Sequence, residues 1–310
     1  MQAISHEDRA TILTEALPYI RKYHNKIVVV KYGGAAMLNE ALKRQVMGDI
    51  ALLHLVGVRV VLVHGGGPEI NDMLGVMGKK AQFIDGLRVT DKDTVDVVQM
   101  VLAGKINKGL VALMESFGRH AIGLSGLDGR MIHARQLDKQ LGYVGEITSI
   151  DPVPITTVLE KDYIPIISTL GCDKSGNVYN INADTAAAKI AAALGAESLM
   201  LMSDIPGLLR DVKDESSLIR RVNITEIAQL IKQGVISGGM IPKIESCVEA
   251  LENGVRKIFI LDGRVEHSIL MEILTDAGIG TMIRTDAASP QQTKAYEGEK
   301  RDENQGNGFR

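Results

Sequence analysis

The feature that most constrains the fold of this sequence is an alternation of β-branched runs with stretches of helical periodicity. The runs at residues 27–30 (IVVV) and 59–63 (RVVLV) are typical of buried strands. Apolar residues recur at helical spacing elsewhere, as in residues 93–116, which predicts amphipathic helices. This alternation predicts an α/β protein whose mostly parallel sheet is covered by helices on both faces. Further strands are expected at 121–124, 164–167, 199–202, 257–261 and 281–284, and further helices around 42–53, 183–194, 224–233, 241–252 and 266–276.

Composition excludes several classes of function. The chain of 310 residues is 45% hydrophobic and 24% charged, and its formal net charge is -3. That charge gives no general attraction to nucleic acid or to an anionic membrane, so we expect neither as a partner. No apolar run is long enough for a membrane span and the first residues do not form a secretory signal, so we expect a cytoplasmic protein. Cys172 and Cys247 stand alone, so neither a disulfide framework nor a zinc site is expected.

The two ends of the chain differ from its middle. Residues 1–25 contain TILTEALPYIRKY, an amphipathic helix interrupted by Pro18. This helix either packs on its own domain or docks on another subunit. Residues 287–310 are polar and poor in apolar side chains, so we expect them to be disordered and assign them no site.

Four unusual segments lie where predicted strands give way to helices, which is where open α/β sheets bind ligands. They are KYGG (31–34), HGGG (64–67), YNINADTAAAK (179–189) and SGGMIPK (237–243). Glycine pairs occur in many turns, and Asp184 also suits the start of a helix for structural reasons alone. Lys31 is harder to explain structurally, because a lysine at the end of a buried strand needs an anion nearby.

The four segments together favour phosphate chemistry, although not of the commonest kinds. The sequence contains no G-x-x-x-x-G-K-[ST] motif, and no G-x-G-x-x-G follows the first strand. Phosphoryl transfer needs the two reactants in line and positive charge over the transferring group. We therefore expect Lys31 and Lys243 to bracket that group, with Asp184 between them holding both ammonium groups in place.

The same segments carry a resemblance to a known family. In this order, KYGG, HGGG, GLRVT (86–90), NINAD (180–184), SDIPGLL (203–209) and GGMIPK (238–243) closely resemble the motifs of the N-acetylglutamate kinases, in the amino acid kinase family. The resemblance covers roughly residues 26–286. It implies a three-layer α/β/α sandwich that phosphorylates the side-chain carboxylate of N-acetyl-L-glutamate with ATP, an early step of arginine biosynthesis. It also implies an acetylglutamate-binding lobe at 26–196, with dimerisation, and a nucleotide-binding lobe at 197–286.

The resemblance also implies roles for individual residues. Lys31 and Lys243 would stabilise the transition state, and Asp184 would organise them. The substrate would be bound by the backbone N–H groups of Gly66 and Gly67 near its reacting carboxylate, and by Arg88 and Asn180 at its α-carboxylate. The phosphate and nucleotide would be bordered by Gly34, Ser203, Asp204, Gly239 and Met240. Mg²⁺ is expected with ATP, and no protein ligand for it is named because Mg²⁺ favours water and phosphate oxygens.

A second resemblance concerns regulation. The segments EALPYIRKY and EHSILMEILTDAGIGTMI are similar to those of the arginine-inhibited members of the family. In those members the kinked N-terminal helix links dimers into a hexamer, a trimer of dimers, and arginine binds near that helix. The resemblance therefore implies arginine as an inhibitor, with Tyr19, Glu272 and Gly278 as contacts. Phe259 departs from the pattern, because some arginine-sensitive relatives carry a histidine there.

Other functions fit the same sequence. The nearest rivals share the fold and change the acceptor to another acylated amino acid, to carbamate or to aspartate. No added regulatory domain follows residue 286, which disfavours an aspartate kinase. A non-catalytic nucleotide or amino acid sensor is less consistent with two lysines and Asp184. Turnover with each acceptor distinguishes these alternatives.

Overall fold

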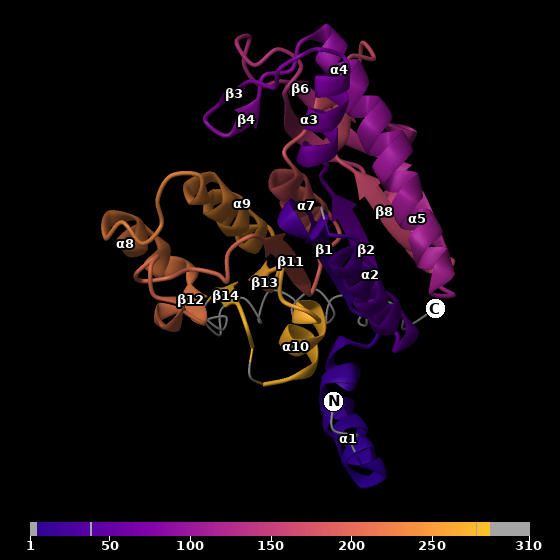
Figure 1. The fold of residues 1–310 in the computed structure, drawn as a ribbon, viewed down its shortest axis with the longest axis vertical. Coiled ribbons are helices and arrows are strands. Elements are labelled where there is room, and N and C mark those ends of the chain that lie inside the picture. Colours follow the sequence, from indigo (N-terminus) through magenta and orange to yellow (C-terminus); the bar gives the residue numbers. More distant parts are fainter. Residues whose placement is uncertain (1–4, 38, 277, 286–310) are drawn as a thin grey trace, which may run out of the picture.

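The computed structural model of the protein describes residues 5–37, 39–276 and 278–285. In this part of the chain the central element is an eight-stranded sheet of order β12-β14-β13-β11-β1-β2-β8-β5 (Figure 1). Neighbours from β13 to β5 are parallel, and β14 is antiparallel to β13, so the predicted mostly parallel sheet is confirmed. The strands are β12 (Arg221–Asn223), β14 (Thr281–Arg284), β13 (Lys257–Asp262), β11 (Ser198–Ser203), β1 (Ile27–Tyr32), β2 (Arg59–His64), β8 (Ile164–Ser168) and β5 (Ala121–Ser125).

Helices cover both faces of the sheet, because alternate side chains of each strand point to opposite sides. Val28 and Val30 belong to the core beneath one helical layer, and Val29 belongs to the core beneath the other. The first layer includes α2 (Glu40–Leu55), α5 (Asn107–Ser116) and α10 (Ser268–Leu274). The second includes α6 (Val153–Glu160), α7 (Ala183–Ala193), α8 (Ile227–Lys232) and α9 (Met240–Glu252). The remaining helices are α1 (His6–Tyr23), α3 (Gly67–Val76) and α4 (Lys92–Gln99), with short 3-10 turns η1 (Gly34–Met37), η3 (Asp128–Arg130), η4 (Glu215–Ser217) and η5 (Ile224–Glu226).

Several elements are not predicted from the sequence. Four short strands form a second sheet of order β10-β9-β6-β7, and β3 and β4 form a small hairpin. Their bounds are β3 (Phe83–Ile84), β4 (Leu87–Arg88), β6 (Ile132–Gln136), β7 (Gly145–Ile150), β9 (Leu170–Cys172) and β10 (Val178–Asn180). These strands alternate or mix polar and apolar residues, so they lack the continuous β-branched runs of the central strands. The predicted helix at 266–276 is shorter, spanning Ser268–Leu274.

The predicted helix at 93–116 contains a change of helical type. Between α4 and α5 the segment η2 (Met100–Ile106) is a π-helix, with wider turns than the α-helices on either side. The whole stretch Lys92–Ser116 has the length and mean hydropathy of a membrane span, although it is not a continuous apolar run, since charged residues such as Asp93, Lys105 and Lys108 interrupt it. Its buried side chains, including Val98, Leu102 and Leu110, belong instead to the protein core, as expected for a core helix.

The N-terminal helix α1 is continuous through Pro18, where the sequence predicts an interruption. It projects from the rest of the molecule near α2 and α10 (Figure 1). Its apolar residues Ile12, Leu13 and Leu17 are more than half exposed, at 54%, 71% and 52%. These side chains are not packed on the helix's own domain, which was the first of the two alternatives for this segment.

Candidate functional site

The predicted site lies at the carboxyl ends of the central strands. β1 pairs with β2 on one side and with β11 on the other, so the segments that follow these three strands are neighbours. Lys31 pairs in register with Val63 and Leu201, and Tyr32 with His64. The KYGG and HGGG segments and Ser203 therefore meet at one edge of the sheet. The topology alone brings together segments that are far apart in sequence.

Three predicted catalytic side chains converge at this edge. Lys31 Nζ lies 3.0 Å from Asp184 Oδ1, and Lys243 Nζ contacts Asp184 Oδ2. Asp184 is in the first turn of α7, whose N-cap Asn182 accepts hydrogen bonds from the backbone N–H groups of Asp184 and Thr185. Lys31 Nζ also lies 3.4 Å from the carbonyl oxygen of Met202. One carboxylate therefore holds two ammonium groups that come from different ends of the chain.

The charges of this cluster determine the protonation of its carboxyl group. Burial alone would raise the pKa of Asp184, but the positive charges and hydrogen bonds of Lys31 and Lys243 outweigh it and lower that pKa to about 2. Asp184 is therefore ionised near neutral pH. Two ammonium groups and one carboxylate leave a net positive site, which suits a multiply charged anion.

The HGGG segment forms the turn from β2 into α3. Gly66 is the N-cap of α3 and Pro68 occupies its first turn, where the missing N–H costs nothing. Within the described chain, the N–H groups of Gly66 and Gly67 donate no hydrogen bond to the protein. Free N–H groups at the start of a helix attract anions. The turn therefore offers two backbone donors at the edge where the lysines meet.

Arg88 on β4 lies next to this turn. Its side chain is buried, with the residue only 7% exposed, and Nη2 donates to the carbonyl oxygen of Gly67 at 3.1 Å. Nη1 is buried without a hydrogen-bond acceptor among the described residues. The guanidinium also lies 4.9 Å from the centre of the Phe83 ring. Burial lowers the pKa of Arg88, and an unpaired buried donor of this kind indicates a missing anionic partner.

Asn180 lies on β10 near the same region. Its Nδ2 donates to Thr90 Oγ1 at 3.3 Å, and its backbone N–H donates to the carbonyl oxygen of Tyr143 at 2.8 Å. Thr90 Oγ1 in turn donates to the carbonyl oxygen of Arg88 at 2.8 Å. Asn180 is thereby linked through one hydroxyl to the backbone of Arg88, so the two predicted substrate contacts belong to one hydrogen-bonded group.

The residues predicted at the phosphate and nucleotide lie on two sides of the lysines. Gly34 has a φ of +70°, which favours glycine, and a Cβ added there would collide with the carboxylate of Asp204. Ser203 ends β11, and its carbonyl oxygen accepts a 2.8 Å hydrogen bond from the N–H of Gly263. Gly239 is the N-cap of α9 and Met240 its first residue, one turn before Lys243. The structure therefore places these residues at the ends of β1, β11 and the start of α9.

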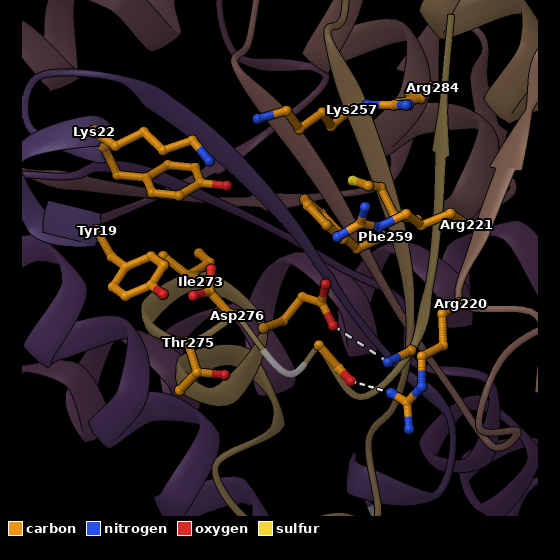
Figure 2. Close-up of a pocket in the computed structure, with 15 residues that line it drawn as sticks. Tyr19, Lys22, Arg220, Arg221, Lys257, Phe259, Ile273, Thr275, Asp276 and Arg284 are labelled. Atoms are coloured by element: carbon orange, nitrogen blue, oxygen red, sulfur yellow. Dashed lines mark hydrogen bonds between the residues drawn. The ribbon is translucent and has the colours of Figure 1, made fainter. Parts of the chain in front are cut away.

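The three residues predicted for arginine lie together, away from the lysine cluster. Tyr19, Glu272 and Gly278 line a cavity of about 420 Å³ between α1, α10 and the edge of the sheet, shown in Figure 2. The Glu272 carboxylate accepts hydrogen bonds from the backbone N–H groups of Ile279 (2.8 Å) and Gly280 (3.2 Å). Arg220 donates to the carbonyl oxygen of Gly278. The sequence did not predict the other charged residues that line this cavity, namely Lys22, Arg220, Arg221, Lys257, Asp276 and Arg284.

Two residues near the glycine turn are also missed by the sequence reasoning. His64 is part of the HGGG motif, but the motif drew attention to its glycines alone. Its ring contacts Asn107, which lies 43 residues later in the chain. A histidine at the end of a buried strand is the one signal that could have identified it, by the same reasoning that identified Lys31.

The chain is similar to known proteins over most of its length. The model of the amino acid kinase family matches residues 26–262. The acetylglutamate kinase of Brachyspira hyodysenteriae is 54% identical over 288 residues, which cover 92% of this chain and 100% of the relative. The acetylglutamate kinase of Thermosynechococcus vestitus is 53% identical over 281 residues, covering 90% of this chain and 95% of the relative.

The fold is also similar to that of solved structures. N-acetylglutamate synthase from Neisseria gonorrhoeae, complexed with coenzyme A and N-acetyl-glutamate, matches with a TM-score of 0.79 and 28% identity. The match covers 90% of this chain and 64% of the synthase chain. The same synthase complexed with coenzyme A and L-arginine matches with a TM-score of 0.75 and 26% identity, over 90% of this chain and 66% of that one.

Proposed function

The chain belongs to the amino acid kinase family and, within it, to the acetylglutamate kinases, and from this premise we propose how its residues carry out and control the reaction. The reaction is the phosphorylation of N-acetylglutamate with ATP as co-substrate, in arginine biosynthesis. The observation that best supports a catalytic role for this site is the convergence of Lys31 and Lys243 on Asp184.

The lysines act on the transferring phosphoryl group. In this proposal Lys31 and Lys243 lie over its oxygens and stabilise the negative charge in the transition state. The side-chain carboxylate of N-acetyl-L-glutamate attacks the γ-phosphorus, the bond from that phosphorus to the β,γ-bridging oxygen breaks, and ADP leaves. The products are N-acetyl-L-glutamyl 5-phosphate and ADP, and no proton transfer is needed because the attacking group is already ionised. Asp184 keeps the two ammonium groups apart and aimed.

Mg²⁺ is proposed to enter with ATP. Among the described residues, no group of three or more His, Cys, Asp and Glu side chains converges to hold a metal ion. Mg²⁺ commonly keeps several waters and binds substrate phosphates. We therefore propose that phosphate oxygens and water coordinate Mg²⁺. The protein itself contributes the positive charge of the two lysines at the phosphates.

The acceptor is proposed to bind on the side of the glycine turn and β4. The N–H groups of Gly66 and Gly67 hold the reacting carboxylate, and Arg88 holds the α-carboxylate together with Asn180. The support for Arg88 is its buried Nη1, which has no acceptor among the described residues. A planar guanidinium with one occupied and one free nitrogen matches a carboxylate.

The nucleotide is proposed to bind on the opposite side. Gly34 contacts the phosphoryl oxygens through its backbone, and Ser203, Asp204, Gly239 and Met240 border the nucleotide. In this proposal residues 26–196 form the acetylglutamate-binding and dimerisation lobe, and residues 197–286 form the nucleotide lobe. The lobes share one sheet, in which β1 pairs with β11.

The cavity beside α1 is proposed to bind arginine as a feedback inhibitor. Tyr19, Glu272 and Gly278 line it together, and the Glu272 carboxylate suits the guanidinium of the ligand (Figure 2). Basic side chains such as Lys257 suit the ligand's carboxylate. Phe259, at the position where some arginine-sensitive relatives carry a histidine, also lines this cavity. A structurally similar synthase was solved with L-arginine, although that complex concerns another protein.

The exposed apolar residues of α1 support a further proposal about assembly. Ile12, Leu13 and Leu17 would be covered if α1 packed on a second copy of the chain, as in a hexameric trimer of dimers. Residues 287–310 lie outside the described part of the chain and take no part in this proposal. We also propose a cytoplasmic location, where ATP and the biosynthetic substrate are available.

Turnover with ATP and different acceptors tests the proposed function. The purified protein should release ADP with N-acetyl-L-glutamate far faster than with aspartate, carbamate or an aminoadipate derivative. A pocket for one more methylene alters selectivity by only ~1–3 kcal/mol, so the rates must be compared side by side. Equal or higher turnover with a rival acceptor would contradict the proposed substrate.

Arginine titration tests the proposed control. Activity should fall with millimolar arginine, and the Glu272→Gln variant should lose most of that inhibition relative to its own uninhibited rate. The matched comparison is Glu266→Gln, which changes an exposed carboxylate that does not line the cavity. An unchanged wild-type rate at millimolar arginine, in a protein shown to be hexameric, would remove the regulatory proposal.

A further inference from the structure

His64 lies beneath the glycine turn of the proposed substrate site. It is the last residue of β2 and is fully buried, at 0% exposure. Its Nδ1 is 2.9 Å from the carbonyl oxygen of Gly65, and its Nε2 is 3.2 Å from Nδ2 of Asn107. The proposed mechanism uses neither His64 nor Asn107. Burying a polar histidine ring is costly unless its hydrogen bonds are satisfied, so its two polar contacts suggest a specific role.

The two contacts determine which nitrogen carries the proton. A carbonyl oxygen can only accept, so Nδ1 must donate to Gly65. The Asn107 Nδ2 faces two carbonyl oxygens as well as the ring, those of Ile166 at 2.8 Å and Leu124 at 3.2 Å. These two carbonyl oxygens identify Nδ2 as the amide nitrogen, and because the proton is on Nδ1, Nε2 of His64 is a third acceptor that shares its two hydrogens. The ring is therefore the neutral Nδ1–H tautomer.

Burial keeps the ring neutral. It lowers the pKa of His64 to about 4, and the backbone hydrogen bond to Gly65 only partly opposes that effect. A neutral ring has one donor and one acceptor, which are the two groups that its neighbours require. The tautomer is consequently constant across the pH range in which a cytoplasmic enzyme works.

We propose that His64 is a positioning residue that aims the N–H of Gly66 at the reacting carboxylate, an inference that rests on the proposed function. The described chain has no cis peptide bond, so the peptide unit between Gly65 and Gly66 is planar and trans. In such a unit the C=O and the N–H point in opposite directions. By holding the carbonyl oxygen of Gly65 on the core side, Nδ1–H of His64 turns the N–H of Gly66 outward.

The remaining contacts of the turn complete this arrangement. The N–H of Gly65 donates to the carbonyl oxygen of Tyr32 at 3.1 Å, so both polar groups of Gly65 are bonded. The carbonyl oxygen of Gly66 accepts the first hydrogen bond of α3, from the N–H of Ile70 at 3.0 Å. The N–H of Gly66, like that of Gly67, has no protein acceptor in the described chain. It is a group that the turn leaves for a ligand.

The π-helix η2 supplies the support behind the turn. Leu102 and Ile106, both within η2, contact the place where a Gly66 side chain would begin. Asn107, the next residue, begins α5 and reaches His64. The wider turns of a π-helix change the angular spacing of the side chains along the helix. Leu102 and Ile106 can therefore lie against Gly66 while Asn107 contacts His64. Such π segments are frequent at functional sites.

Variants of His64 in the full-length chain test the inference. His64→Leu removes the donor, and kcat with ATP and N-acetyl-L-glutamate should fall roughly 10- to 100-fold, below the loss expected for removing a transition-state donor outright. KM for ATP should change less than about twofold, because the nucleotide lies on the other side. His64→Asn places an amide nitrogen near the position of Nδ1 and should recover kcat to within about threefold of the wild type.

Controls separate positioning from general loss of structure. His54→Leu removes another histidine with a burial-lowered pKa, on α2 beside Asp162, and should leave kcat unchanged. The inference is overturned if His64→Leu retains kcat within about threefold, or if His64→Asn is no better than His64→Leu. An inactive wild type would instead overturn the proposed function, and this inference with it.

A spectroscopic measurement covers the case in which His64→Leu does not fold. Nitrogen-15 NMR of histidine-labelled wild-type protein, with the His64 signals assigned by their loss in His64→Asn, reports the tautomer directly. The expected result is a neutral ring protonated at Nδ1, unchanged between pH 6 and pH 8. A ring protonated at Nε2, or one that titrates in this range, contradicts the inference.

Discussion

The two glycine turns of the proposed site differ in what lies behind them. At the turn of residues 64–67, which is proposed to bind the substrate and is called the substrate turn here, a Cβ on Gly66 would be 2.6 Å from Leu102 Cδ2 and closer still to Ile106 Cδ1. At the turn of residues 237–240, which is proposed to border the nucleotide and is called the nucleotide turn, Gly238 and Gly239 have no atom within 4 Å of an added Cβ. The same residue type therefore has opposite surroundings at two places in one site.

The two turns are held in place by different interactions. Leu102 and Ile106 pack against the substrate turn, so we expect its N–H groups to keep their directions before the proposed acceptor binds. Fixed dipoles are effective in catalysis because they need no reorganisation during the reaction. The nucleotide turn is open, and Lys243, which follows it on α9, is held by its ion pair with Asp184. The substrate turn is held by packing, whereas Lys243 beside the nucleotide turn is held by an ion pair.

The largest loss of kcat is expected on removing Lys243, which is held by its ion pair with Asp184. Lys243→Ala removes one of the two ammonium groups, and kcat should fall roughly 100-fold or more, the scale of losing one preorganised donor. The measurement is steady-state turnover with saturating ATP and N-acetyl-L-glutamate. Lys189→Ala is the matched control, because it removes the Lys189–Glu249 ion pair between the same two helices outside the site. A loss below tenfold for Lys243→Ala would contradict its proposed role.

The next effect tests the packing side of the comparison. Gly66→Ala inserts a methyl group against Leu102 and Ile106, and overpacking of this kind costs about 1–3 kcal/mol of the free energy of unfolding. Because the turn must shift to admit the methyl group, turnover should fall as well. Urea denaturation and kinetics measure the two effects. Gly65→Ala is the control, since its nearest new contact would be Ala183 Cβ at 3.4 Å, an ordinary distance, and its stability should change less.

The charged residues of the site were easier to predict from the sequence than the packing behind Gly66. The valines of β1 and β2 predicted the parallel sheet, because strands buried on both faces need continuous apolar runs. Lys31 was identifiable as a charge at the end of such a run. The support of Gly66 was not, because it depends on Leu102 and Ile106, whose orientation is set by a π-helix that the periodicity of residues 93–116 does not reveal.

The short strands and the neighbours of Arg88 were hidden for a related reason. A strand of two or three residues, such as β4 or β9, has no periodicity to detect, so its position is known only after the long elements have packed. The unpaired Nη1 of Arg88 is likewise a property of the folded surroundings and not of the motif GLRVT. Residue types were predictable here, whereas their burial and partners were not.

A smaller effect is expected in the pH dependence of the free energy of unfolding, through the ion pairs of Asp184. The pKa of Asp184 is lowered from 3.8 to about 2 in the folded protein, so its ion pairs stabilise the fold above pH 4–5 and that contribution is lost as pH falls through 2. By pH 3 the loss should reach about 1 kcal/mol. Urea unfolding of the wild type and of Asp184→Asn, from pH 6 down to pH 3, measures it. Parallel pH dependences of the two proteins would show that Asp184 contributes no such term.

The smallest effect is expected at the open turn. Gly239→Ala adds a methyl group where φ is −64° and nothing lies within 4 Å, so the free energy of unfolding should change by less than about 0.5 kcal/mol. The added group points into space that the proposal gives to the nucleotide, so KM for ATP should rise by about threefold, or about 0.6 kcal/mol, with kcat retained. Differential scanning fluorimetry and ATP titration measure both quantities. If Gly239→Ala lost as much stability as Gly66→Ala, the two turns would be equally constrained and the distinction between packing and charge would fail.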